Sequence, residues 1–191
     1  MRTQDLEKRE RILDSTEQII RTDGIAAVSL SKIAKAANIA PGTLYTYFTD
    51  KNDMLRTLYL NRKKALAAAI TTIDLANDPV QELNHFMDLV FDYGKQHLDD
   101  MLLIREFNQA AILKQLGITV QDAYAGFEVL ATFVERATAQ DVFVAINYDV
   151  LMAYAYTPVL EYLIATTSGT IDADLVSFDK IKWLSQRAIV K

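Results

Sequence analysis

The sequence predicts an all-α protein of about nine helices, and three observations support this fold class. Apolar residues recur at spacings of three, four and seven along most of the 191 residues, which is the repeat of an amphipathic helix. Glycine (6) and proline (3) are scarce, so few turns interrupt the chain. With 51% apolar and 24% charged residues, the chain can bury a core. The length suits one large domain, or one small and one medium domain.

The first three predicted helices are short and closely spaced. Residues 4–22 form an amphipathic helix that carries Leu6 on its apolar stripe, and Gly24 follows its end. Ser29 is a good N-cap for a two-turn helix, which Asn38 ends because asparagine tolerates positive φ. Pro41 then fits the first turn of a helix over residues 41–48. This order of elements is that of a helix-turn-helix.

Six longer helices follow, each beginning at a residue that can cap it. Their expected ranges are 51–74, 78–97, 99–117, 119–137, 147–168 and 172–189. Residues 141–146 have the composition of a strand, but no partner strand is evident, so we expect an extended connection there.

The helix over residues 41–48 has two distinct sides. Leu44 and Phe48 lie one turn apart and define a buried side. At about 100° per residue, Gly42, Thr43, Tyr45 and Thr46 then face outward, and Tyr47 falls on the border. Eight residues do not form a stable helix alone, so neighbouring helices must hold this one. The outward face is therefore available to a partner.

Net charge differs between the two parts of the chain. Residues 1–64 contain 12 lysines and arginines against 8 aspartates and glutamates, a net of +4, whereas residues 65–191 contain 8 against 17, a net of −9. A positive front end favours a polyanionic partner for that part only.

Residues 12–55 resemble the DNA-binding domain of the TetR family of bacterial transcription regulators. The segment IAKAANIAPGTLYTYFTDKNDML, which begins at Ile33, follows the family pattern closely. It departs from the pattern at Asn38, where glycine is commonest, and at Ala40, where serine or threonine usually caps the helix. The resemblance implies a helix-turn-helix DNA-binding domain over residues 1–50 and a helical ligand-binding and dimerisation domain over residues 51–191.

The resemblance also implies residue roles at the DNA. The expected DNA-binding residues are Ser29, Pro41, Gly42, Thr43, Tyr45, Thr46, Tyr47 and Lys51. Of these, Tyr45, Lys51 and Ser29 would contact phosphates, and the threonines and tyrosines would lie in or beside the major groove. The helix contains no arginine, asparagine or glutamine, the usual bidentate readers of bases.

The second domain is expected to form a homodimer and to bind a small-molecule effector. The last helix is apolar over more than half of its circumference, which suggests burial both in its own core and against a partner. The expected interface residues are Tyr162, Phe178, Ile181, Trp183 and Leu184. Candidate effector-binding residues, expected on buried faces, are His85, Tyr93, Phe107, Asn108, Tyr124, Phe127 and Tyr154.

Several other classes of function are disfavoured. There is no cysteine, which excludes disulfides, thiolate zinc sites and cysteine nucleophiles. Glu82 and His85 match half of a di-iron motif whose second half is absent. We therefore expect no catalytic residues, no metal and no cofactor. The charged amino terminus lacks the apolar region of a signal peptide, and residues 150–165 are too short to cross a membrane, so we expect a cytoplasmic protein.

The function predicted from the sequence is that of a ligand-responsive DNA-binding regulator. We expect a repressor that binds a palindromic operator as a dimer and is released by a small molecule. Two alternatives stay open: an activator, or an all-helical binding or assembly protein whose helix-turn-helix is only structural. A steep dependence of nucleic-acid affinity on salt would argue against the last alternative.

Overall fold

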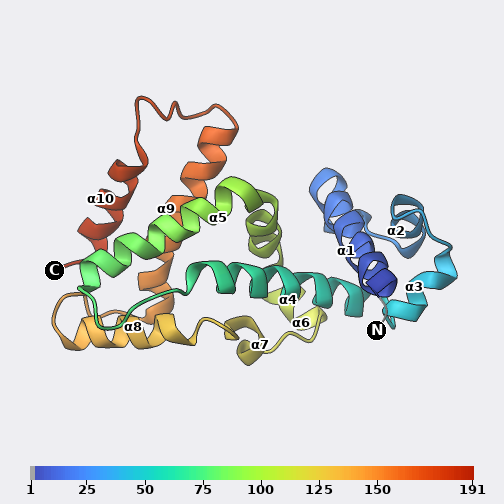
Figure 1. The fold of residues 1–191 in the computed structure, drawn as a ribbon, viewed down its shortest axis with the longest axis horizontal. Coiled ribbons are helices and arrows are strands. Elements are labelled where there is room, and N and C mark those ends of the chain that lie inside the picture. Colours follow the sequence, from blue (N-terminus) through green and yellow to red (C-terminus); the bar gives the residue numbers. More distant parts are fainter. Residues whose placement is uncertain (1–2) are drawn as a thin grey trace. The chain divides into compact units, whose positions relative to one another are not determined.

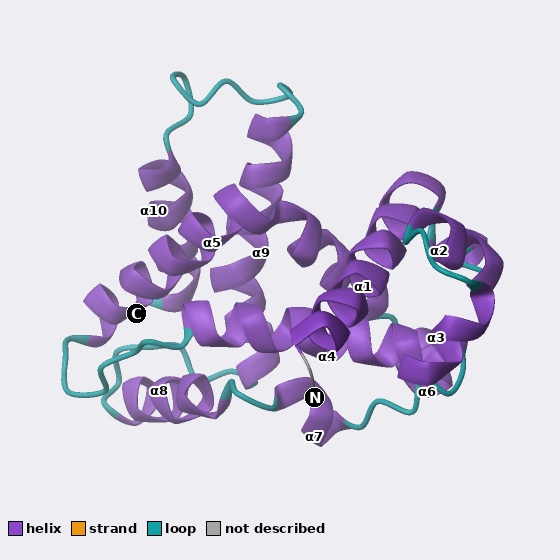
Figure 2. Ribbon diagram, turned by 45° about the vertical axis from the view of Figure 1, so that its right-hand side comes forward, coloured by secondary structure: helices purple, strands orange, loops and turns teal. Residues whose placement is uncertain are grey.

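The computed structural model describes residues 3–191, with side chains from Asp5 onward, and these residues form helices joined by turns and loops (Figures 1 and 2). In this range the elements are α1 (Thr3–Asp23), the 3₁₀ turn η1 (Ile25–Ala27), α2 (Leu30–Ala36), α3 (Pro41–Tyr47), α4 (Lys51–Ile70), α5 (Pro79–Phe107), α6 (Ala110–Gln115), α7 (Val120–Tyr124), α8 (Glu128–Ala139), α9 (Tyr148–Thr167) and α10 (Phe178–Ile189). The all-α fold class is confirmed.

The chain divides into two compact units. Unit 1 comprises residues 1–63 and 102–123, and unit 2 comprises residues 64–101 and 124–191. The helices α4 and α5 each contribute residues to both units. The division into functional domains at residue 50 stays a prediction, because these units are defined by packing and not by function.

The first half of the chain follows the sequence-based helix boundaries closely. The break expected between residues 97 and 99 is also present, since His97 adopts non-helical angles (φ −134°, ψ 38°) inside α5. The extended connection expected over residues 141–146 is only partly present, because Asp141 lies in a turn with a φ of 61°. The segment also has a partner, since Phe143 forms an isolated antiparallel bridge with Val190. Leu6, expected on the buried stripe of α1, is instead 49% exposed.

Three predictions for later helices were wrong. The helix expected over residues 99–117 is interrupted after Phe107, and the one expected over 119–137 is two helices separated at Gly126, whose φ of 88° no helix accommodates. The last helix begins at Phe178 and not at Asp172. The carbonyl of Asp172 instead accepts the amide hydrogens of Leu175 and Val176, which makes a local turn.

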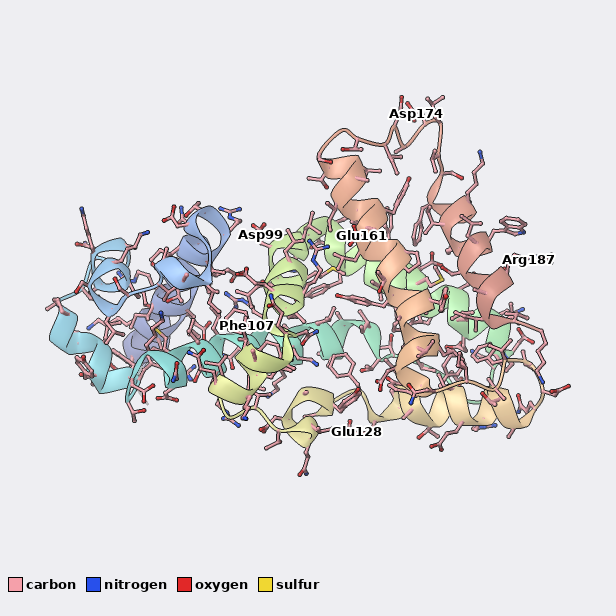
Figure 3. The ribbon with its side chains drawn as sticks, turned by 180° about the vertical axis from the view of Figure 1, so that it is seen from behind. Asp99, Phe107, Glu128, Glu161, Asp174 and Arg187 are labelled. Carbon is pink, nitrogen blue, oxygen red and sulfur yellow. The ribbon has the colours of Figure 1, made fainter. Side chains whose placement is uncertain are left out.

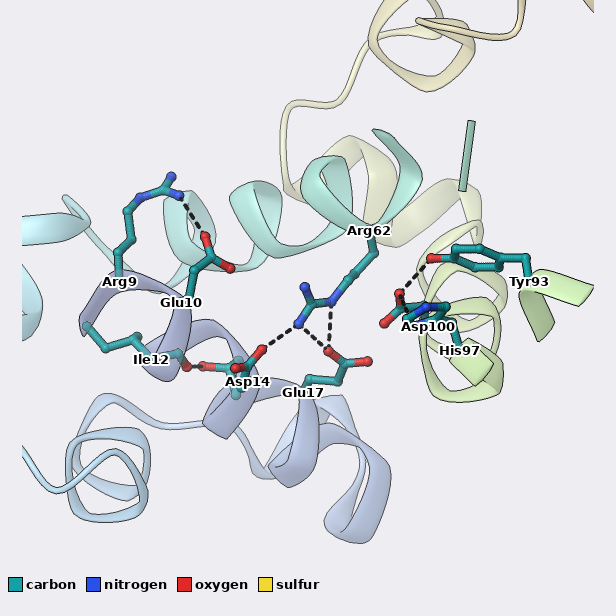
Figure 4. A network of polar contacts seen from close by, with 10 residues as sticks. Arg9, Glu10, Ile12, Asp14, Glu17, Arg62, Tyr93, His97 and Asp100 are labelled. Atoms are coloured by element: carbon teal, nitrogen blue, oxygen red, sulfur yellow. Dashed lines mark hydrogen bonds and ion pairs between the residues drawn. The ribbon is translucent and has the colours of Figure 1, made fainter. Parts of the chain in front are cut away.

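In unit 1, polar side chains join α4 to its neighbours on two sides. The Arg62 guanidinium forms ion pairs with Asp14 and Glu17 of α1, both at 2.7 Å (Figure 4). On another side, Arg56 pairs with Asp122 at 2.9 Å, and the Tyr59 hydroxyl donates to Asn108 Oδ1 at 2.7 Å. These contacts fix α4 against the first helix and against the segment 102–123.

In unit 2, α9 packs against both α10 and α5. Gly94 of α5 permits a close approach, since a Cβ built there would collide with Cδ1 of Leu163 on α9. The rings of Phe91 and Phe178 stack at 4.1 Å, and Tyr162 lies beside both. The long loop between α9 and α10 carries Asp174 at its far end (Figure 3).

Lys63 provides a test of the packing in unit 1. Its ammonium group donates to the carbonyl oxygen of Ala123 and lies 5.7 Å from the centre of the Tyr59 ring. Burial lowers the pKa of Lys63 to about 8 from its usual 10.5. Between those two values the unfolded chain binds more protons than the folded chain, so this group makes the free energy of unfolding rise as pH rises from 8 to 10.5.

We predict that Lys63→Met loses this contribution. Between pH 7.5 and 9.5, the free energy of unfolding of the wild type should rise relative to that of Lys63→Met by about 1–2 kcal/mol, after allowance for solvent screening. Urea unfolding at the two pH values measures this difference. Lys64→Met, which removes the exposed neighbouring lysine, should behave like the wild type. Equal pH dependence in Lys63→Met and wild type would contradict the assignment.

Candidate nucleic-acid interface

The turn between α2 and α3 is a Schellman motif encoded by Asn38. This residue has a φ of 53°, and the amide of Ile39 donates to the carbonyl of Ala34 at 2.9 Å. At the other end of α2, Ser29 is the expected N-cap: its Oγ accepts the amide hydrogen of Lys32 at 3.3 Å. Both ends of α2 are therefore fixed by local hydrogen bonds.

Two apolar side chains anchor α3. Leu44 is 1% exposed, and Phe48, the C-cap, is also buried and donates its amide hydrogen to the carbonyl of Leu44 at 3.0 Å. Pro41 occupies the first turn, and Ala40 provides no side-chain cap. A helix of seven residues depends on such packing for its stability.

The outward side of α3 is as predicted from the helical angles. Pro41, Gly42, Tyr45 and Thr46 are exposed, and Thr43 is half-buried. Tyr45 is 61% exposed although it directly follows the buried Leu44. A small, polar and phenolic surface is therefore held rigidly toward the outside.

Tyr47 differs from Tyr45 because it turns toward α1. It is half-buried, and its hydroxyl lies 3.4 Å from Oδ1 of Asp5 in the first turn of α1. Burial, and then the negative charge of Asp5, raises the pKa of the Tyr47 phenol. One turn further along α1, the guanidinium of Arg9 lies 5.3 Å from the centre of the Phe48 ring. The carboxyl end of α3 therefore contacts the amino end of α1.

Lys51 begins α4, beside two carboxylates that already occupy this helix end. Asp50 Oδ1 accepts the amide hydrogen of Asp53 at 2.9 Å, and Asp53 Oδ2 accepts that of Thr49 at 2.8 Å. Asp50 therefore caps the start of α4, and the Asp53 carboxylate reaches back to Thr49.

Positive charge near α3 is partly neutralised within the chain. Lys32 of α2 pairs with Asp23 at 2.5 Å, and this hydrogen bond together with the lysine charge lowers the pKa of Asp23. The pair lies on the exposed surface, so it contributes little to stability and can exchange partners.

The candidate effector-binding residues lie at separate places. In unit 1, Phe107, which is labelled in Figure 3, stacks on Tyr59. Asn108 accepts a hydrogen bond from the hydroxyl of the same tyrosine. In unit 2, the Tyr93 hydroxyl donates to Asp100 at 2.7 Å (Figure 4), whereas that of Tyr124 donates to Asp149 at 2.5 Å. Phe127 is the half-buried N-cap of α8. Their roles stay predictions.

The expectation that all of these residues face inward was wrong for three of them. His85, Tyr124 and Tyr154 are exposed. In α9, for example, Leu151 and Ala155 take the inner positions, which turns Tyr154 outward. Glu82 is buried and accepts from Asn77 Nδ2 and the amide of Asp74, so it fixes the loop before α5. Exposed His85 therefore does not form a site with it.

The predicted interface residues divide into two groups. Tyr162 is buried, and its hydroxyl donates to the carbonyl of Val176 at 2.8 Å, while Phe178 and Ile181 are half-buried. Trp183 and Leu184 are 57% and 56% exposed on α10. Only the second group presents a large apolar surface on the isolated chain.

None of the helices in residues 3–191 combines the length and apolar character that a bilayer crossing requires.

Known proteins show the same domain and the same fold. Residues 12–58 match the family model described as bacterial regulatory proteins, tetR family. An uncharacterized HTH-type transcriptional regulator of Haemophilus influenzae is 39% identical over 46 residues, about a quarter of each chain. The regulator UidR of Escherichia coli is 29% identical over 138 residues, which cover 65% of this chain and 66% of UidR.

Similarity of fold extends along the whole chain. A TetR family transcription regulator from Marinobacter aquaeolei has a TM-score of 0.83 over 100% of both chains, at 20% identity. The matched helix-turn-helix and this shared all-helical fold give one conclusion: residues 12–58 match the helix-turn-helix DNA-binding domain of the TetR family, and the chain as a whole has the fold of TetR-family regulators.

Proposed function

We propose that this regulator is a repressor that binds a near-palindromic operator as a homodimer and is released by a small molecule. The observation that carries the DNA-binding part is the fixed presentation of α3, in which buried Leu44 and Phe48 leave Tyr45 and its neighbours outward. TetR-family regulators are non-enzymatic transcription factors, which agrees with the expectation that the chain is not an enzyme.

Gly42 supports close approach of α3 to DNA. A Cβ built at this position meets no atom within 4 Å, and its φ is not positive, so neither packing nor backbone conformation requires glycine there. Alanine would be the better helix former. A glycine that the fold does not need is explained if an external surface, such as the sugar-phosphate backbone, comes close to it.

Phosphate contacts would come from three side chains around α3. The Ser29 hydroxyl accepts the cap hydrogen bond and still has its own proton to donate. Tyr45 has an exposed phenol, and Lys51 offers its ammonium group. Such contacts fix the register of the protein on the duplex, and base-edge contacts then give the specificity.

Base recognition would depend on Thr43, Thr46 and the shape of the DNA. The sequence of α3, PGTLYTY, provides no bidentate base reader. Threonine methyl groups can contact thymine methyls, and positioning on the backbone can sense groove width and deformability. We therefore propose an operator whose recognition depends strongly on shape.

A homodimer would place two copies of α3 on one operator. Trp183 and Leu184 are the exposed apolar residues of α10 that a second copy would cover. A two-fold axis through this surface makes the same patch self-complementary, and two half-sites about one helical turn apart follow from the symmetry.

The effector would act by shifting a population of conformations. A small molecule that prefers one conformation of unit 2 stabilises it by its difference in affinity. Because α4 contributes residues to both units, a change in this helix would reach the recognition helices and weaken operator binding.

The DNA-contact surface is tested with duplexes selected from a random library by the full chain. We predict that Thr43→Ala combined with Tyr45→Ala weakens binding to the selected duplex at least about tenfold, since two contacts of about 1 kcal/mol each are lost. Gly42→Ala should also weaken it while the fold becomes no less stable. Gel shifts measure the affinity, and Gln18→Ala, on the exposed side of α1, is the control.

Affinity of the double variant equal to that of the wild type would refute the roles assigned to α3. Failure of the wild type to enrich any sequence, even at low salt, would refute operator binding itself.

The dimer surface is tested by Leu184→Glu. A buried carboxylate without a partner is unfavourable, so we predict that the dimer dissociation constant rises at least about tenfold. Sedimentation velocity over a range of concentrations measures it. Val120→Glu alters another exposed apolar residue, which lies outside α10 and is 76% exposed against 56% for Leu184, and should leave dimerisation unchanged. A wild type that remains monomeric at micromolar concentrations, or a Leu184→Glu variant that dimerises normally, would contradict the proposal.

A further inference from the structure

The two tyrosines of α3 have different surroundings. Tyr45 is 61% exposed, whereas Tyr47 is half-buried and its hydroxyl lies 3.4 Å from Oδ1 of Asp5. The family resemblance implies that both residues bind DNA. The contact with Asp5 indicates that the Tyr47 hydroxyl is already engaged within the chain.

The contact joins two segments that are far apart in sequence, since Asp5 and Tyr47 are 42 positions apart. Beside it, Arg9 lies over the ring of Phe48 and forms a 3.9 Å ion pair with Glu10 (Figure 4). Two successive turns of α1 therefore hold the last residues of α3. Leu44 anchors the middle of the same helix.

The contact between Asp5 and Tyr47 would affect recognition by limiting the tilt of α3. A seven-residue helix that pivots about one buried side chain can change its tilt, and small tilts move Thr43 and Thr46 relative to base edges. A second point of attachment at the carboxyl end removes that freedom. Loss of ordering in a binding surface lowers affinity for the correct partner, since the conformational freedom that the surface gains must then be removed on binding.

The phenol of Tyr47 stays a donor at neutral pH. Its raised pKa, due first to burial and then to the charge of Asp5, is only partly offset by the nearby charge of Arg11. A protonated phenol beside an ionised carboxylate is a stable donor–acceptor pair.

We propose that Asp5 is a positioning residue for DNA recognition, which holds α3 through the Tyr47 hydroxyl, and that this hydroxyl acts as an internal brace and not as a DNA contact. The inference rests on the proposed DNA-binding function and deepens it. It also gives the first turn of α1 a role in operator specificity.

A double-mutant cycle tests the brace. Asp5→Ala, Tyr47→Phe and the double variant are compared for affinity to the selected duplex and to a random-sequence duplex of the same length. We expect each single change to lower the ratio of the two affinities about three- to tenfold, and the double variant to lower it no further than either single change. Melting temperatures of the full-length proteins report whether the fold is retained.

Two matched variants separate the effect of the Tyr47–Asp5 hydrogen bond from the effect of a negative charge on α1. Asp5→Asn retains a side-chain oxygen that accepts from Tyr47, and should restore the affinity ratio. Glu7→Gln removes a neighbouring exposed carboxylate of α1 and should strengthen binding to both duplexes alike, as loss of repulsion from phosphate does. Tyr45→Phe, in contrast, should act independently of Asp5→Ala.

Two results would overturn the inference. If Tyr47 contacts DNA directly, Asp5→Ala would preserve or raise the affinity ratio while Tyr47→Phe lowers it. Additive losses in the double variant would likewise show that the two side chains act separately. If the wild type selects no sequence at all, the proposed function fails first, and that outcome is distinct from both of these.

Discussion

Burial of Leu44 and Phe48 is the interaction on which the DNA-binding end of this protein depends. The helix that carries them is too short to be stable alone, so its direction and its exposed face follow from where these two side chains are packed. Once they are fixed, the 100° step of the helix turns Gly42, Tyr45 and Thr46 outward. The same packing that stabilises the unit therefore creates the exposed face that we propose contacts DNA.

The neighbours of α3 add precision to this arrangement. The turn at Asn38 sets the angle between α2 and α3. The contacts of Asp5 and Arg9 with Tyr47 and Phe48 hold the carboxyl end of α3. In the same unit, Arg62 bonds α4 to α1 through two carboxylates. In this cluster Arg62 and Glu17 are mostly buried, with 18% and 13% of their side chains exposed, so their ion pair can specify one orientation among several that apolar packing alone would allow.

Local signals allowed much of this fold to be predicted from sequence. Ser29, Asn38 and Pro41 each act within a few residues of their own position, so their effects on helix ends could be inferred directly. The break at His97 followed from the capping residues after it. The exposed side of α3 followed from helical geometry.

The remaining features depend on contacts that one sequence does not reveal. Asp172 and Ser177 are both good caps, and only the packing of α10 decides between them. An isolated Gly126 is compatible with a helix until its φ is known. Likewise, His85 and Tyr154 lie one helical step from buried residues, so a small error in the assumed face reversed their exposure. The role of Asp5 depends on a partner 42 residues away.

Hydrogen exchange of the free protein tests the central claim most directly. If buried Leu44 and Phe48 hold α3 before DNA arrives, the amides of Tyr45 to Phe48 should be protected to a degree similar to those in the middle of α1, and Leu44→Ala should abolish that protection selectively. Exchange of these amides at the rate of an unstructured peptide, with protection gained only on binding DNA, would show that α3 folds on its target and would contradict the account.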